Sequence, residues 1–399
     1  MPIETPTLSR RGFLTRSAAI GCSLAASPLV TPVSFAAAPW DTRLVVILLR
    51  GGMDGLDVVQ PYGDPAFSGL RKTLLGGPEN DAIDLDGYFS LHPALVSLMP
   101  LWEAGDLGFV HATSTPYRDK RSHFDGQDLL EAGTAHVVSG HDGWLNRMIG
   151  LRSDLSSDTA YALGRTEMKM LIGPAPHSTW APDSGFEMSP QAMRLAELIM
   201  KDDEAMAEAF AQAVRLSDEE ARLESGMEGG QKRRAEHLAV ADFAAQRLRE
   251  DARIAAFSLN GWDMHIRQKP VMARTLKRLA DTILALRDGM GAAVWGKTAV
   301  LAMTEFGRTV RENGTDGTDH GTGGAMLLAG GAINGGRVFG QWPGLSEADL
   351  YDRRDLMPTT DVRAHAAWMM QGLTGVNRNA LENVVFPGVD MGDDPGLLL

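Results

Sequence analysis

The sequence has almost no cysteine, because Cys22 is the only one among its 399 residues. That position lies in the N-terminal stretch that is interpreted below as an export signal, so we expect no thiol in the mature chain. A chain without thiols cannot form disulfide bonds, thiolate metal sites or a cysteine nucleophile. These three kinds of site are therefore excluded for the mature protein.

A membrane-spanning run and a basic charge balance are also missing. Nothing after the N-terminal region approaches the ~18 uninterrupted apolar residues of a membrane helix, so we expect no membrane span in the mature chain. The 38 basic residues are outnumbered by 51 acidic residues, which gives a formal charge of -13. Nucleic-acid-binding proteins usually present a basic surface, so we expect no nucleic-acid partner. The 44% hydrophobic content is ordinary for a globular protein with a large core.

The N-terminus carries the pattern of a twin-arginine export signal. Arg10 and Arg11 precede an apolar, alanine-rich stretch, and small residues suited to cleavage follow it. We therefore assign residues 1–38 to a signal. The signal predicts a periplasmic or secreted protein that is a partner of the twin-arginine export machinery. Lipidation at Cys22 is the alternative, because "AIGC" loosely resembles a lipoprotein box.

Short apolar runs alternate with amphipathic helical patterns through most of the remaining chain. This alternation predicts an α/β fold with a doubly wound, mostly parallel sheet. The predicted strands are 44–49, 106–112, 253–259, 297–304 and 325–332, and the predicted helices are 92–105, 122–133, 271–291 and 359–375. Two long helices are predicted over about 191–253. We therefore predict a single α/β domain over residues 39–399 with this helical insertion.

Chargeable residues lie next to nearly every predicted strand. Because the carboxyl ends of parallel strands meet at one edge of a sheet, we expect these side chains in one crevice. Carboxylate oxygens and imidazole nitrogens are ligands for divalent ions. The sequence therefore predicts a site for one or two divalent metal ions, namely zinc, manganese or calcium. The candidate ligands are Asp54, Asp57, Asp263, His265, Glu305, Asp319 and His320.

Structural roles are the alternatives at several positions. Asp54 and Asp57 alternatively shape a turn after the first strand, and Glu305 alternatively forms an ion pair with Arg308. The glycines of "GTDGTDHGTGG", residues 314–324, either form a plain polar turn or let the chain bend its ligands over the sheet edge. Histidines without neighbouring ligand candidates are interpreted as structural, and these include His92, His141 and His365.

Several of these segments together resemble a known bacterial family. The segments are "VVILLRGGMDGLDVV", "YRDKRSHFDGQDLLEAG", "AAFSLNGWDMH", "MTEFGRTVRENGTDGTDHGTGGAMLLAGG" and "WPGL". They are similar to the secreted family catalogued as domain of unknown function 1501, over almost the whole mature chain. That family is grouped with the alkaline-phosphatase-like superfamily of phosphatases, sulfatases and cofactor-independent phosphoglycerate mutases. The resemblance implies a doubly wound α/β sheet whose strand ends hold one or two divalent metals.

The resemblance also implies phosphoryl or sulfuryl transfer through a covalent intermediate on a residue at the start of the second sheet helix. Ser122 lies close to that place, and Arg118 and Arg121 are the candidates for gripping the anionic substrate oxygens. Ser114 is the alternative nucleophile, because "STPYR" fits the sulfatase pattern Ser-x-Pro-x-Arg. A plain helix N-cap is the alternative role for Ser122.

The ligand positions match the superfamily pattern only in part. Glu305 stands where the superfamily has an aspartate, and Phe306 stands where it has a histidine. Gly51 or Gly52 occupies the usual place of the first-strand aspartate. The positions that resemble the pattern are Asp263, His265 and His320.

We therefore predict an exported metal-dependent hydrolase of phosphate or sulfate monoesters, or of related anionic esters. A small anionic ester or a polysaccharide would be its substrate. The alternative is a non-catalytic envelope protein that keeps the fold and binds a glycan or a protein partner in the same cleft, because a fold alone does not establish chemistry.

Overall fold

The apolar run that follows the predicted signal forms the central strand, β1 (Arg43–Arg50). Its side chains at 45, 47 and 49 belong to one buried apolar cluster, and those at 44, 46 and 48 belong to a second cluster. Successive side chains of a strand point to opposite faces, so β1 is covered on both faces. A strand buried in this way reads as a continuous apolar run, as it does here.

The computed structural model describes residues 38–118, 121–137, 142–182 and 235–399, together with residues 199, 206 and 210. The predicted export signal, except Ala38, and most of the predicted insertion lie outside the described residues. The described part of the insertion is mainly α9 (Glu236–Arg249). Within the described residues, no helix is both long enough and apolar enough to cross a membrane.

The five predicted strands all belong to one nine-stranded sheet. The strand order is β11-β5-β10-β9-β1-β8-β6-β7, and β12 also pairs with β5. β10 is antiparallel to both of its neighbours, and the other pairs in this sheet are parallel. The predicted α/β class with a doubly wound, mostly parallel sheet is therefore confirmed. The remaining strands of this sheet are β5 (Leu107–Ser114), β6 (Ala160–Leu163), β7 (Ser178–Trp180), β8 (Ile254–Asn260), β9 (Thr298–Met303), β10 (Gly324–Ala329), β11 (Val338–Phe339) and β12 (Thr360–Asp361).

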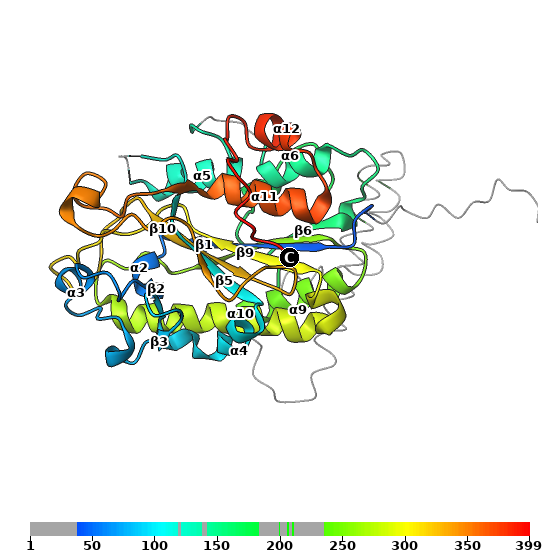
Figure 1. The fold of residues 1–399 in the computed structure, drawn as a ribbon. Coiled ribbons are helices and arrows are strands. Elements are labelled where there is room, and N and C mark those ends of the chain that lie inside the picture. Colours follow the sequence, from blue (N-terminus) through cyan, green and yellow to red (C-terminus); the bar gives the residue numbers. More distant parts are fainter. Residues whose placement is uncertain are drawn as a thin grey trace, which may run out of the picture. The chain divides into compact units, whose positions relative to one another are not determined.

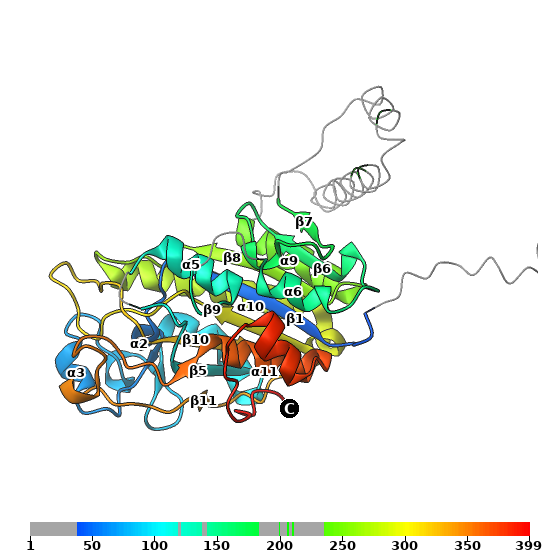
Figure 2. The ribbon, with the colours of Figure 1, turned by 90° about the horizontal axis from the view of Figure 1, so that it is seen from above.

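Helices cover both faces of the sheet (Figures 1 and 2). α4 (Met99–Ala104), α9 and α10 (Gln268–Trp295) supply side chains to one apolar cluster. α5 (His123–Ala132), α6 (Trp144–Gly150) and α11 (Val362–Thr374) supply side chains to the other. The described residues also form α2 (Gly55–Val58), α3 (Phe67–Leu70), α12 (Arg378–Ala380), several short 3-10 or π helices, and a small sheet of β2 (Val59–Gln60), β3 (Ile83–Asp84) and β4 (Ser90–Leu91).

Three neighbouring strands end at the same edge of the sheet. β1 pairs in parallel with β8 on one side and with β9 on the other, with Arg50 opposite Asn260 and Leu48 opposite Met303. The segments that leave these strands therefore start side by side. This edge is where ligands bind in open α/β sheets, and it is where the candidate ligands gather.

Candidate metal centre

Three histidines converge on one carboxylate beyond this edge. Asp263 Oδ1 lies 2.9 Å from His265 Nε2 and 3.2 Å from His320 Nε2. The same oxygen lies 3.4 Å from His123 Nε2. The Nε2 atoms of His265 and His320 are themselves 2.9 Å apart. We call these four residues the His–Asp cluster.

The other ring nitrogen of each histidine binds an oxygen outside the cluster. The pairs are His123 with the Glu305 carboxylate (2.7 Å), His265 with the Asp319 carboxylate (3.2 Å) and His320 with the Arg121 carbonyl (2.8 Å). Ionised carboxylates and carbonyls only accept hydrogen bonds, so each Nδ1 carries a proton, and in the neutral form of each ring Nε2 presents a lone pair. The cluster is thus a set of three lone pairs and a carboxylate oxygen that face one another.

This donor set fits a divalent metal ion. His123 Nε2 is buried and makes no hydrogen bond within the described part of the chain, although Asp263 lies close to it. His123, Asp263 and His320 each offer a ligand atom, and these atoms lie within 4.8 Å of one another. Neutral imidazole and carboxylate are ligands of zinc and similar ions. Contacts from Nδ1 to an acceptor are also the ones that orient metal-binding histidines.

Electrostatics keep the two central groups in the forms that bind a cation. Burial raises the pKa of Asp263, but the Arg308 guanidinium and the neighbouring histidines outweigh it and hold that pKa well below its usual range. Burial lowers the pKa of His320, and this outweighs the hydrogen bond to the Arg121 carbonyl. Asp263 is therefore an anion, and His320 is favoured as the neutral base.

Glu305 is not part of the cluster. It contacts the Nδ1 atom of His123, whereas the Nε2 atom of the same ring lies near Asp263. Its Oε1 atom accepts hydrogen bonds from the Gly51 N–H (2.9 Å) and from Gln127 (3.0 Å), besides the contact to His123. Its side chain is only 1% exposed. Burial raises the pKa of Glu305, but the hydrogen bonds from His123 and Gln127 outweigh it and lower that pKa. A buried, ionised Glu305 therefore fixes the ring of His123.

His123 is absent from the residues predicted from the sequence. It is the first residue of α5, directly after Ser122. Its ring stacks on Phe306, with centroids 5.0 Å apart. Phe306 cannot bind a metal, and His123 supplies an imidazole beside it. His123 could have been proposed from the sequence, because it directly follows Ser122 at the predicted start of a helix.

Arg308 anchors Asp263. Its guanidinium donates to Asp263 Oδ1 (2.8 Å) and to the backbone carbonyls of Gly51, Gly52 and Trp262. Arg308 is 1% exposed. The alternative in which Arg308 pairs with Glu305 is wrong, because its carboxylate partner is Asp263.

Gly51 explains why no aspartate stands at the end of β1. Its φ is +122°, and a Cβ atom at this position would lie 2.4 Å from the Asp263 backbone nitrogen. A side chain therefore cannot occupy the position. The close approach lets the Gly51 N–H reach the Glu305 carboxylate instead.

Asp54 and Asp57, which were predicted as ligands, are not brought into the His–Asp cluster and bind other side chains. Asp54 forms a bidentate ion pair with Arg71, at 2.6 and 3.1 Å, and its side chain caps α2. Gln268 donates to both carboxylates, at 2.7 and 2.9 Å. The alternative role of Asp54 in shaping the turn after β1 is therefore the one that the structure shows. The ion pair and the cap occupy the Asp54 oxygens that a metal would need, and Asp57 accepts a hydrogen bond from Gln268.

The electrostatics of this pair agree with a structural role. Burial raises the pKa of Asp54, but Arg71 outweighs it and lowers that pKa. Burial and the charge of Asp54 raise the pKa of Asp57 to about 6. Asp54 is therefore the ionised member of the pair.

The predicted catalytic groups lie next to the cluster but mostly bind other atoms. The Ser122 hydroxyl accepts the Asp125 N–H at 3.4 Å as the N-cap of α5. The Arg118 guanidinium binds the Ser114 hydroxyl and nearby backbone carbonyls. The Arg121 guanidinium lies 3.9 Å from Asp355, while its carbonyl binds His320. The contact from the described part of this loop to the cluster is thus the one from the Arg121 backbone carbonyl to His320.

One family matches the sequence. The model of the family described as "Protein of unknown function (DUF1501)" matches residues 153–385, which is more than half of the chain. The chain belongs to the DUF1501 family. The matched region of this family member contains Asp263, His265, Glu305, Asp319 and His320, and it leaves out His123. No curated protein sequence matches this family member.

Solved structures resemble the fold of this DUF1501 protein at low identity. The zinc complex of the C-terminal periplasmic domain of EcEptC from Escherichia coli is 10% identical, with a TM-score of 0.36 and coverage of 72% of this chain and 73% of that chain. The lipoteichoic acid synthase LtaP from Listeria monocytogenes is 8% identical, with a TM-score of 0.39 and coverage of 90% and 78%. A protein in the alkaline phosphatase superfamily from Vibrio parahaemolyticus is 11% identical, with a TM-score of 0.33 and coverage of 73% and 61%.

Proposed function

We propose that this protein is a metal-dependent hydrolase of phosphate or sulfate monoesters. The convergence of three imidazole nitrogens on Asp263 Oδ1 is the observation that supports it most directly. His123, Asp263 and His320 would hold a divalent ion, and His265 with Asp319 lies beside them. Such an ion supplies Lewis acidity to an anionic ester and lowers the pKa of a hydroxyl group at the site.

Ser122 is the nucleophile in this proposal. Its neighbours in the chain, Arg121 and His123, both contact cluster residues. Its hydrogen bond from the Asp125 N–H is long, at 3.4 Å, and is therefore weak. The first turn of α5 presents backbone N–H groups and the positive end of the helix dipole to an anion. These features favour an anionic ester beside Ser122.

The proposed reaction has two displacements at phosphorus or sulfur. In the first, the Ser122 oxygen bonds to this atom and its proton passes to the solvent, while the bond to the alcohol oxygen breaks and the alcohol takes a proton from the solvent. Water then hydrolyses the serine ester, which releases phosphate or sulfate and restores the hydroxyl. Arg121, whose side chain is 39% exposed, is the better placed of the two predicted arginines to grip a substrate oxygen.

We also propose that the protein acts outside the cytoplasm. The twin arginines Arg10 and Arg11 and the apolar stretch after them support export through the twin-arginine machinery. That route carries folded proteins, so it suits a metal bound before export. A fusion of residues 1–38 to a reporter protein would test export, and loss of export on changing both arginines to lysine is the expected result.

The test of the hydrolase function combines metal analysis with turnover of 4-nitrophenyl phosphate and 4-nitrophenyl sulfate. We expect Ser122→Ala to abolish turnover and keep the metal, and His320→Ala to lose both. Ser114→Ala is the matched control and should keep both. Loss of turnover only in Ser114→Ala would move the nucleophile to that serine. A folded wild-type protein with neither metal nor turnover would contradict the proposal and favour the non-catalytic binding protein.

A further inference from the structure

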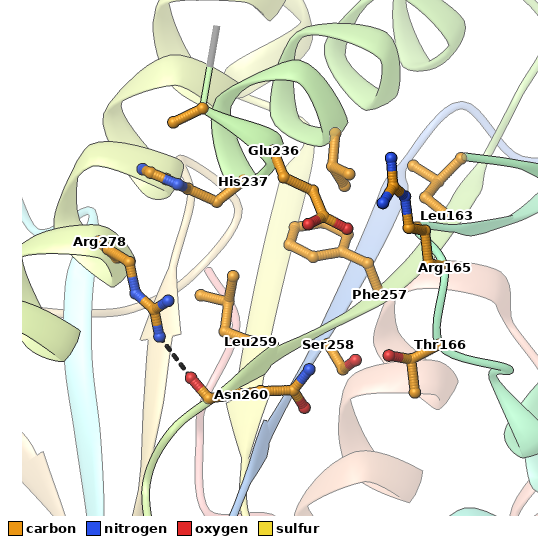
Figure 3. Close-up of a pocket in the computed structure, with 13 residues that line it drawn as sticks. Leu163, Arg165, Thr166, Glu236, His237, Phe257, Ser258, Leu259, Asn260 and Arg278 are labelled. Carbon is orange, nitrogen blue, oxygen red and sulfur yellow. Dashed lines mark hydrogen bonds between the residues drawn. The ribbon is translucent and has the colours of Figure 1, made fainter. Parts of the chain in front are cut away.

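A second polar site lies at the same edge of the sheet as the His–Asp cluster. It is a cavity of ≈ 370 Å³ between the ends of β6 and β8, the start of α9 and one turn of α10 (Figure 3). We call it the β6–β8 cavity. Small-molecule sites have volumes of roughly 300–1,000 Å³, so the cavity is large enough for a small organic group. Its polar lining residues include Arg165, Thr166, Glu236, Ser258, Asn260 and Arg278.

β8 connects this cavity directly to the cluster. Asn260 is the last residue of β8 and lines the cavity, and Asp263 follows three positions later. An extended chain spans at most ~3.6 Å per residue, so these two Cα atoms lie no more than ~11 Å apart. The cavity lining and the cluster therefore lie within three residues of one another along the end of β8 and the turn after it.

The turn between the two sites is held in place. Gly261 has a φ of +101°, which lets β8 turn sharply after Asn260. The Arg278 guanidinium donates a hydrogen bond to the Asn260 carbonyl, as Figure 3 shows. The Trp262 indole N–H donates to the Leu259 carbonyl at 2.9 Å. These contacts hold the end of β8 beside the cavity, and Asp263 has a separate anchor in Arg308.

The lining of the β6–β8 cavity suits a hydroxyl-rich ligand. Arg165 and Arg278 bring guanidinium donors, Glu236 brings a carboxylate acceptor, and the Asn260 amide both donates and accepts. Figure 3 shows these groups around one space, with Arg278 on the left and Arg165 on the right. Apolar side chains also line it, namely Leu163, Val240 and Leu259. A sugar ring has both hydroxyl groups and apolar C–H faces, and it can satisfy both kinds of surface.

An alkyl or aryl group suits the same cavity poorly. It would desolvate the guanidinium, carboxylate and amide groups without giving them hydrogen-bond partners. Arg165, Glu236, Asn260 and Arg278 are exposed residues, so a bound group replaces the water around them. A sugar hydroxyl group replaces the hydrogen bonds of that water, and an alkyl or aryl group does not. The polar lining therefore favours a sugar over an apolar leaving group.

We infer that the β6–β8 cavity binds the sugar part of a sugar phosphate or sugar sulfate whose ester group lies at the His–Asp cluster. This inference rests on the proposed hydrolase function and narrows its substrate class. Arg278 and Asn260 contact the sugar and determine specificity. They take no part in the chemistry at the ester.

The test uses two cavity variants, Arg278→Met and Asn260→Leu. Arg287→Met is the matched control, because it removes an arginine from α10 outside the cavity. The KM values for glucose 6-phosphate and glucose 6-sulfate are compared with those for the two 4-nitrophenyl esters. We expect each cavity variant to raise the KM of the sugar ester that turns over by about tenfold or more, the effect of losing a hydrogen bond to a charged or buried group. The KM values for the 4-nitrophenyl esters should change by less than about twofold, and the control should change neither.

The possible failures can be told apart. If the variants hydrolyse sugar esters with wild-type KM values, the cavity assignment is overturned and the hydrolase function stands. If the wild type turns over no ester, the hydrolase function fails. Binding of glucose 6-sulfate, measured by saturation-transfer NMR, then decides whether the β6–β8 cavity binds the sugar. Weaker binding to both cavity variants but not to Arg287→Met supports it, and equal or absent binding overturns it.

Discussion

His123 is the residue on which the candidate metal centre depends most. Glu305 holds its Nδ1 atom at 2.7 Å, and Phe306 lies against its ring, so the Nε2 atom faces Asp263. Glu305 is itself fixed by the Gly51 N–H and by Gln127. Glu305, held by Gly51 and Gln127, and the stacked ring of Phe306 therefore set the direction in which the His123 Nε2 atom points.

The first prediction tests Glu305 as the group that orients His123. Glu305→Gln keeps the shape of the side chain but removes its charge, so the His123 ring is held less firmly and is less basic. Losing such a partner typically lowers metal affinity by about 10–100-fold. Competition for zinc against a chelating dye at pH 7.5 measures the change. Glu131→Gln is the control, because Glu131 is also buried in this region but pairs with Arg50. An equal loss of affinity in both variants would show that Glu305 acts only through stability.

Part of this site could be read from the sequence and part could not. Asp263 and His265 were expected at this edge because they follow a strand that ends there. Asp319 and His320 precede the next strand and were expected there because the glycine-rich loop can bend over the edge. His123 was missed because a histidine at a helix start has many structural uses. Its role depends on Glu305, 182 positions away in the chain. Such a pairing is set by tertiary packing, and local spacing does not reveal it.

At the scale of elements, the segment after β1 holds a buried charged network. Arg71 is 1% exposed and binds Asp54 together with the backbone carbonyls of Thr309 and Val310. The network therefore ties the start of α2 to the segment that leads into the glycine-rich loop. It stabilises the support of the site and supplies no ligand to it.

The second prediction concerns this network. Arg71→Met should lower the free energy of unfolding by about 3–5 kcal/mol, because it leaves Asp54 buried without its cation. Urea unfolding of the metal-free protein measures the change. Arg152→Met is the control, because it breaks an exposed ion pair with Asp154 and should change little. Asp54→Asn should leave the zinc content unchanged, and loss of zinc in that variant would restore Asp54 as a ligand.

The elements themselves were predictable where local signals are strong. Ser122 and Gly133 cap α5 as expected, and β1 is the central strand that its apolar run predicts. The direction of β10 was not foreseen. β9 and β10 are joined by residues 304–323 without a described helix, and the crossover of a parallel return is usually a helix. The direction of β10 therefore depends on its connection from β9, and the apolar run of β10 alone does not reveal it.

At the scale of the whole molecule, buried histidines set the response to acid. Burial lowers the pKa values of His92, His111 and His365 to about 4. The Nδ1 atoms of His92 and His111 accept backbone N–H groups at 3.1 and 2.9 Å, which only an unprotonated nitrogen can do. The folded state therefore holds neutral imidazoles that the unfolded chain protonates near its ordinary pKa of 6.5.

The third prediction is the direction in which the stability of the folded protein changes with pH, and it follows from these pKa values. Above pH 6.5 the histidines are neutral in both states, and the folded protein keeps its full stability. Between about pH 6.5 and 4 the unfolded chain binds protons that the folded protein excludes, so stability falls as the pH falls. Each histidine contributes up to about 1.4 kcal/mol per pH unit. Three carboxyl groups act in the opposite direction, because burial raises the pKa of Asp57 to about 6 and also raises the pKa values of Glu131 and Asp355. The contribution of one imidazole is therefore measured by a single substitution.

His92→Asn tests this acid response without removing the helix cap. Asparagine accepts the Ala94 N–H as histidine does, but it does not titrate. We expect the slope of unfolding free energy against pH to become shallower by up to about 1.4 kcal/mol per pH unit between pH 6.5 and 4. Urea unfolding with a chelator present excludes changes caused by metal loss at low pH. His136→Asn, at an exposed position, is the control and should leave the slope unchanged. An unchanged slope in His92→Asn would show that His92 is not protected from protonation, and the acid response would then belong to the remaining groups.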